Sequence, residues 1–206
     1  MVLLEIGNRH TAATDVQDSI ETAWVPDIQM PVQFSANNLL MAGLYIRGYD
    51  IAEIADVLEH SSLYARRLFN DARFVQSVPY KIARAQEFLP KSAVQSMLWM
   101  YKHKFLPPIS VMQPYTGEYA DVFSVGQLDA MGAYLAGHTR QKDIIPQVFL
   151  SAGTIRNYFA LGRASIRAEI TDMTSDQRAV TNNLSAGFWM VQHGFLPHDI
   201  IGRDLP

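Results

Sequence analysis

The strongest constraint on the fold is an internal repeat. The segment WMYKHKFLP, residues 99–107, recurs ninety residues later as WMVQHGFLP, residues 189–197. Six of its nine positions are identical, and they include tryptophan, methionine and histidine, which are uncommon residues. The same spacing relates further pairs upstream, namely Ser61 with Ser151, Arg66 with Arg156, Phe69 with Phe159 and Arg73 with Arg163. A fixed period of this length indicates two copies of one structural unit.

The repeat also predicts how the chain is divided. Nearer the N-terminus the spacing is eighty-nine, which pairs Phe34 with Phe123 and Gly48 with Gly137 and implies one inserted residue. The two copies then span residues 34–107 and 123–197. We expect residues 1–33 to form an acidic leader, residues 108–122 a linker with two prolines and no basic residue, and residues 198–206 a C-terminal tail.

Each copy is predicted to hold four helices. The first follows Ser35 or Ser124, which suit a helix N-cap, and ends near Gly48 or Gly137. The second covers about 50–58 or 140–149, where Pro146 should bend or shorten it. Ser61 or Ser151 caps the third helix, and the fourth covers about 91–104 or 176–193. No segment sustains a two-residue alternation of apolar and polar side chains, so we expect an all-α protein of two tandem four-helix domains.

The third helix of each copy carries two stripes of side chains at helical spacing. The apolar stripe, expected in the core, consists of Ala65, Leu68, Phe69 and Ala72 in copy one and of Ile155, Tyr158, Phe159 and Gly162 in copy two. The second stripe consists of Arg66, Asn70 and Arg73 in copy one and of Arg156, Ala160, Arg163 and Arg167 in copy two. An arginine-rich stripe is a candidate surface for a polyanion.

Charge is distributed unevenly along the chain. The net charge is −3, and the first sixty residues carry nine acidic and two basic side chains. Residues 61–104 carry eight basic and two acidic side chains, and residues 137–170 carry five basic and two acidic ones. Positive charge is therefore confined to the two blocks that contain the predicted third helices, and such local fields matter more than the total for binding a polyanion.

Two short helices, a tight turn and a serine-capped third helix make a helix-turn-helix. In copy one the pattern is Gly48…Ile54-Ala55-x-x-Leu58-x-x-Ser61, and in copy two it is Gly137…Ile144-Ile145-x-x-Val148-x-x-Ser151-x-x-Thr154-Ile155-Arg156. These residues resemble the helix-turn-helix of LuxR/GerE-type regulators, and sigma-factor region 4 shares the same positions. The resemblance implies a glycine that ends a scaffold helix, a recognition helix that opens at Ser-x-x-Thr, and a fourth helix that often serves dimerisation.

The resemblance implies a DNA-binding transcriptional regulator whose recognition helices enter the major groove of double-stranded DNA. RNA polymerase or another regulator is a further candidate partner, and the chain would act as a monomer with pseudo-dimeric halves or as a homodimer. The residues expected at the DNA are Ser62, Arg66, Arg67, Asn70, Arg73, Thr154, Arg156, Asn157, Arg163 and Arg167.

Two other interpretations of the arginine stripes stay open. An ion-paired or solvated helix face would look the same in the sequence. A protein-interaction module, such as an antiactivator that reuses the fold to grip another regulator, would also fit, and the acidic first sixty residues favour it. Salt dependence of binding separates DNA from a protein partner, because phosphate contacts release counterions.

Enzymatic and metal chemistry are not expected. Asp50, Glu53, Asp56 and Glu59 are spaced by three along the second helix, but no glycine-rich phosphate-binding loop accompanies them, so a solvated acidic face is favoured. The chain has no cysteine, and the repeated motif supplies one histidine per copy, His103 and His193, so we expect no metal site and no cofactor. With no membrane segment or signal peptide in evidence, we expect a cytoplasmic protein.

Overall fold

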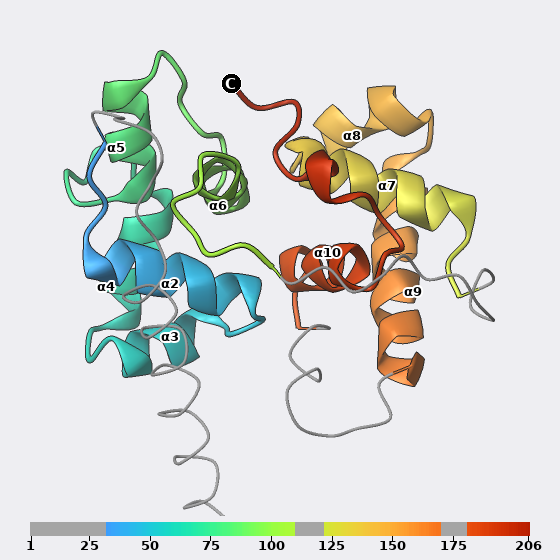
Figure 1. The fold of residues 1–206 in the computed structure, drawn as a ribbon, viewed down its shortest axis with the longest axis horizontal. Coiled ribbons are helices and arrows are strands. Elements are labelled where there is room, and N and C mark those ends of the chain that lie inside the picture. The colour runs from blue at the N-terminus through green and yellow to red at the C-terminus, as the bar shows by residue number, and fades with distance from the viewer. Residues whose placement is uncertain (1–31, 110–121, 170–180) are drawn as a thin grey trace, which may run out of the picture. The chain divides into compact units, whose positions relative to one another are not determined.

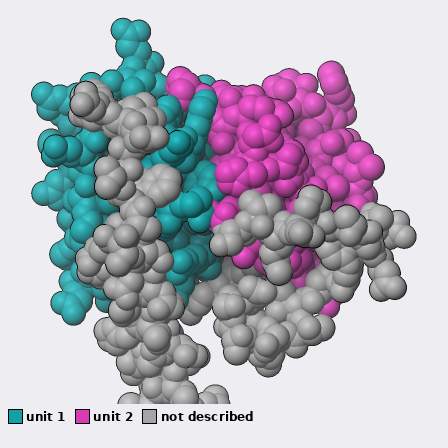
Figure 2. Space-filling model, in the orientation of Figure 1, with its two compact units in different colours: residues 1–108 teal, residues 109–206 magenta. Residues whose placement is uncertain are grey.

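A computed structural model describes residues 32–109, 122–169 and 181–206. All regular elements in these ranges are helices, so the expectation of an all-α protein is confirmed. The chain divides into two compact units, residues 1–108 and 109–206 (Figure 2). The boundary between them coincides with the start of the predicted linker.

Unit 1 contains five described helices (Figure 1). They are α2 (Ala36–Ile46), α3 (Ile51–Val57), α4 (Ser62–Asn70), α5 (Val78–Ala85) and α6 (Ala93–Lys102). Unit 2 contains α7 (Val125–Ala136), α8 (Gln141–Val148), α9 (Ala152–Glu169), α10 (Asn183–Gln192) and the 3₁₀ helix η2 (His198–Ile200).

The predicted caps of the first helices are confirmed. Ser35 forms a capping box with Asn38 at the start of α2, and Ser124 forms one with Gln127 at the start of α7. Behind these helices the chain turns at Gly48 and Gly137, whose φ angles are 89° and 124°. Such positive φ values strain any residue with a Cβ atom, which explains glycine at both positions.

The prediction of four helices per copy is wrong for unit 1, because α5 is a fifth. Helix α4 ends at Asn70, where the extended residue Asp71 uses its carboxylate to accept a hydrogen bond from the Arg73 amide at 3.0 Å. Ser77 then caps α5, and Pro79 occupies its first turn, where a proline is tolerated. In unit 2 the corresponding stretch continues α9 without a break to Glu169.

The fourth helices also begin later than predicted. Helix α6 starts at Ala93 behind the N-cap Ser92, and α10 starts at Asn183 behind the N-cap Asn182. Of the predicted range 176–193, residues 176–180 lie outside the described part of the chain. The acidic leader also lies outside it, apart from residues 32 and 33.

Equivalent aromatic pairs, each with at least one buried ring, recur in both units. Phe34 packs edge-on against Phe105 at 4.8 Å between ring centroids, and Phe123 packs in the same way against Phe195 at 4.8 Å. Tyr45 lies 5.5 Å from Phe69, and Tyr134 lies 5.4 Å from Phe159. Each partner is related to its counterpart by the spacing of the sequence repeat, so the third helix contacts the first helix through the same pair of rings in each unit.

The repeated Trp-Met-x-x-His motif belongs to the core rather than to a surface. Trp99 and Trp189 are 0% and 7% exposed, and each contacts the histidine four residues later, with the rings tilted in unit 1 and stacked in unit 2. His103 and His193 are the C-cap residues of α6 and α10. The expected core stripe on the third helix is also buried, except at Ala72 and Tyr158, which are half-buried.

Residues 198–206, predicted as a tail, pack into unit 2. The Gly202 amide donates to the Leu135 carbonyl at 2.8 Å, and the Asp204 amide donates to the Ala136 carbonyl at 2.9 Å. Leu205 is buried against Gly137, where an added Cβ atom would lie 2.7 Å from the leucine side chain. These contacts extend the second unit to the end of the chain.

Candidate nucleic-acid interface

Both units have the element order and turn length of a helix-turn-helix. Four residues separate α3 from α4, and three separate α8 from α9. The turn passes through one left-handed residue in each unit, Glu59 and Phe149, both with a φ angle of 53°. These two residues are ninety positions apart, so the turns match in the register of the repeat.

A serine caps each third helix, as predicted. The Ser61 hydroxyl accepts a hydrogen bond from the Tyr64 amide at 3.2 Å, and the Ser151 hydroxyl accepts one from the Thr154 amide at 3.1 Å. The Thr154 hydroxyl lies 2.8 Å from that of Ser151, so this predicted DNA contact is already engaged in the cap. Ser62, the first residue of α4, is exposed.

In unit 1 the predicted contacts differ in how strongly their neighbours hold them. Arg66 and Asn70 are exposed, and Arg66 makes no ion pair with any residue that the structure describes. Arg67 lies 3.5 Å from the Asp71 carboxylate and 4.7 Å above the ring of Phe74. No described residue forms an ion pair with Arg66, whereas Arg67 is held against its own unit.

Arg73 is not on the predicted helical stripe. Because α4 ends at Asn70, Arg73 lies in the turn before α5, with its side chain 98% exposed and its guanidinium 4.0 Å from Asp71. The stripe in unit 1 therefore stops at Asn70. Arg73 adds positive charge beyond the end of the helix instead of extending the same face.

In unit 2 the stripe is continuous, because α9 extends through all of its predicted positions. Arg156, Asn157 and Arg167 are exposed. Arg163 is half-buried and donates a hydrogen bond from Nη1 to Oδ1 of Asn183 at the start of α10. The remaining exposed positions of α9 carry mostly small side chains, namely Gly153, Ala160, Ala164 and Ala168.

A cavity of about 400 Å³ opens beside this stripe, and we name it the Arg156–Arg163 cavity after the two arginines that line it. Its other walls come from the end of α7, the start of α8, Phe159 and Asn183. Asn183 was not predicted as a site residue. Its pairing with Arg163 joins two helices across twenty positions of sequence, and no local pattern marks such a contact.

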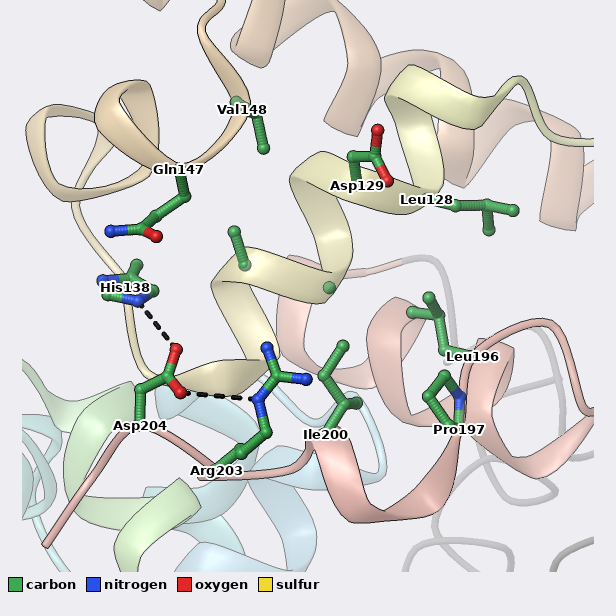
Figure 3. A pocket seen from close by; sticks show the side chains of 12 residues that line it. Leu128, Asp129, His138, Gln147, Val148, Leu196, Pro197, Ile200, Arg203 and Asp204 are labelled. Atoms are coloured by element: carbon green, nitrogen blue, oxygen red, sulfur yellow. Dashed lines mark hydrogen bonds and ion pairs between the residues drawn. The ribbon is translucent and has the colours of Figure 1, made fainter.

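A second cavity of unit 2, of about 360 Å³, lies between α7, the end of α8 and the C-terminal residues (Figure 3). His138 points toward Asp204 there, with Nε2 at 3.0 Å from the carboxylate, and Arg203 approaches the same carboxylate at 3.4 Å (Figure 3). The Asp204 carboxylate thus contacts both His138 and Arg203 on this side of the cavity. The contact between His138 and Asp204 fastens the C-terminal segment to the loop after α7.

Residues 61–104, the positively charged block of unit 1, also contain a lysine that binds a buried side chain. Lys81 on α5 is half-buried, and its Nζ donates to Oδ1 of the buried Asn38 at 2.8 Å. Burial lowers the pKa of Lys81. Near the end of the loop after α7, the Arg140 guanidinium donates to the two Asp143 carboxylate oxygens at 2.7 and 3.0 Å, and this hydrogen bonding raises the pKa of Arg140. Neither cation extends the arginine stripes.

Comparison with known proteins gives no match to a family model, a curated protein or a solved structure. The resemblance to LuxR/GerE-type domains therefore rests on this chain's own residues. Among the described helices, none combines the length and the apolar character needed to cross a membrane.

Proposed function

We propose that the chain is a DNA-binding transcriptional regulator with two tandem helix-turn-helix domains of LuxR/GerE type, in which α4 and α9 are the recognition helices. The observation that carries the proposal is the pair Arg66 and Arg156. They stand ninety residues apart, each on the helix after the left-handed turn, and both are exposed. Neither forms an ion pair with a described residue.

An arginine without a carboxylate partner can give all its donors to a ligand. Guanidinium groups neutralise phosphates and bind the major-groove edge of guanine with two hydrogen bonds. Two such helices in one chain would let a single molecule contact two half-sites, as a dimer does. The proposed regulator needs no cofactor, performs no catalysis and acts in the cytoplasm.

Salt-dependent titration of duplex DNA tests the proposal. Duplexes selected from a random pool by the full chain are titrated by fluorescence anisotropy at several salt concentrations. The logarithm of the association constant should fall linearly with the logarithm of salt concentration, since each phosphate contact releases counterions. Arg66→Ala and Arg156→Ala should weaken binding, whereas Arg203→Ala, an equal change of charge outside both helices, should not. Absence of saturable binding at low salt would exclude this function.

A protein-interaction module is the second candidate, and one observation favours it. Phe149, in the turn before α9, is 92% exposed, and Leu161 on α9 is 54% exposed. Large exposed apolar side chains often mark protein interfaces. Binding to a protein partner would weaken with Phe149→Ser and depend little on salt, whereas DNA binding would show the opposite pattern.

A further inference from the structure

Unit 2 contains a positively charged cavity for which nothing above assigns a ligand. Of the eight described side chains that line the Arg156–Arg163 cavity, two are arginines and none is a carboxylate. The nearest acid in sequence, Asp143 on α8, already binds Arg140 through both carboxylate oxygens. Because a guanidinium stays charged at all accessible pH values, the cavity is positive under all ordinary conditions.

The two arginines are placed to converge on one group. They are seven residues apart on α9, two helical turns or about 10 Å along the axis, and both border the same cavity. Long side chains from such positions can reach a shared anion between them. Planar guanidinium groups match the oxygens of phosphate especially well.

Arg163 is also fixed in place before any ligand arrives. It is half-buried, and its Nη1 donates to Asn183 Oδ1. A guanidinium has five N–H donors, so one bond to Asn183 orients the group and leaves donors for a ligand. Ordering a side chain in advance lowers the entropy lost on binding.

The start of α8 adds to the field in the cavity. Gln141 and Ile144, from the first turn of this helix, line the wall, and the N-cap Arg140 makes no side-chain capping hydrogen bond. Amide dipoles give a helix N-terminus a partial positive charge. The volume of about 400 Å³ lies within the range of small-molecule sites, so a phosphate fits together with the group that carries it.

We propose that the Arg156–Arg163 cavity is a phosphate-binding site. The phosphate belongs either to the backbone of bound DNA, in which case the inference deepens and rests on the proposed function, or to a free phosphorylated ligand. Unit 1 lacks the site. Arg73, the counterpart of Arg163, lies off the helix, and Ala93 stands at the position of Asn183.

Titration of the full chain with inorganic phosphate at constant ionic strength tests the site, with binding followed by NMR. Binding should saturate for the natural chain, and the dissociation constant should rise about tenfold in Arg156→Gln and in Arg163→Gln, as expected for loss of a charge-assisted hydrogen bond. Arg203→Gln removes the same charge from the same unit outside this cavity, so its constant should not change. If Arg163→Gln perturbs the fold, Arg156→Gln alone tests the site, because Arg156 is exposed and its substitution should leave the fold intact.

Duplex DNA distinguishes the two sources of phosphate. Competition between the duplex and inorganic phosphate would assign the site to the DNA backbone. Saturable phosphate binding in a chain that binds no duplex would assign it to a free ligand, so that the inference would stand although the proposed function had failed. The inference is overturned if phosphate binding does not saturate, or if all four proteins bind phosphate equally, whatever the outcome with DNA.

Discussion

At the scale of single residues, neighbours decide what each arginine can do. Arg66 and Arg156 have no ionic partner among the described residues, whereas Arg67 is held by Asp71 and by the ring of Phe74. An exposed ion pair of this kind contributes little to stability, yet it restricts where the guanidinium points. Arg66 and Arg156 are therefore the better probes of binding, and changes at Arg67 would mix binding with local structure.

Arg156→Ala separates base readout from a backbone phosphate contact in the Arg156–Arg163 cavity, whereas Arg73 is expected to add affinity that is independent of sequence. Unit 2 keeps the fuller recognition-helix opening, with Ser151, Thr154 and Ile155 ahead of Arg156. Arg156→Ala should reduce discrimination between a specific and a scrambled duplex by about 1–3 kcal/mol if it makes a bidentate base contact. Arg73→Ala should weaken both duplexes equally and flatten the salt slope. Anisotropy titrations at several salt concentrations measure both effects, and equal losses on both duplexes for Arg156→Ala would refute base readout.

Phe149 is expected to strain the turn before α9. Its φ of 53° is left-handed, and its side chain, 92% exposed, gains almost nothing from packing. Phe149→Gly should therefore be more stable than Phe149→Ala by about 1 kcal/mol in urea unfolding, because only glycine adopts this conformation without steric cost. The alanine variant is the control, since it removes the ring but keeps the Cβ atom. Equal stabilities would show that the turn is not strained.

Local residue patterns predicted the caps but not the turn conformations. Ser35, Ser61 and Ser124 act within three residues of their own positions, so the sequence alone could predict them. The left-handed residues carry no glycine or asparagine signal, because Glu59 and Phe149 occupy those positions. The contact from Arg163 to Asn183 depends on tertiary packing, which explains why the cavity was not predicted with the stripe.

At the scale of helices, the two units differ most after the third helix. In unit 1 the chain breaks at Asp71 and resumes as α5, whereas α9 is a single helix of 18 residues (Figure 1). Helical periodicity predicted most of the apolar stripe correctly, but Ala72 lies beyond the end of α4, and both Ala72 and Tyr158 are half-buried. The periodicity could not predict the break, because Ala72 and Arg73 continue the period while the Asp71 side chain competes for the backbone.

Asp71 is expected to stabilise this break by about 1 kcal/mol, the usual net contribution of one hydrogen bond. Its carboxylate accepts from the Arg73 amide at 3.0 Å, and its carbonyl accepts from the Ser77 hydroxyl at 2.6 Å. Asp71→Ala should lower stability in urea unfolding, whereas Asp71→Asn, which keeps the acceptor oxygen, should preserve most of it. If both variants lose the same stability, the ion pair with Arg67 matters and the hydrogen bond from the Arg73 amide does not.

At the scale of the molecule, the repeat predicted the core better than the edges of the units. The ring pairs that join the first, third and fourth helices recur in both units, because their residues belong to the repeated positions. Residues 198–206 follow the last repeated residue, so the repeat could not predict that they pack on α7. These C-terminal residues form a wall of unit 2 with a cavity beside it. Comparison of the two copies could not predict either feature.

The acidic leader is expected to weaken DNA binding through competition for the arginine stripes. Residues 1–31 carry five acidic and one basic side chain, so their removal changes the net charge from −3 to +1. The cut belongs before Val32, because Val32 is buried and Phe34 packs on Phe105. Truncation should tighten binding several-fold at low salt, and salt should erase the difference, since it screens charges beyond about 10 Å. A full-length variant with Glu5, Asp15, Asp18, Glu21 and Asp27 changed to their amides is the control. It should match the truncated chain if charge alone is responsible, and unchanged affinity in both would refute autoinhibition.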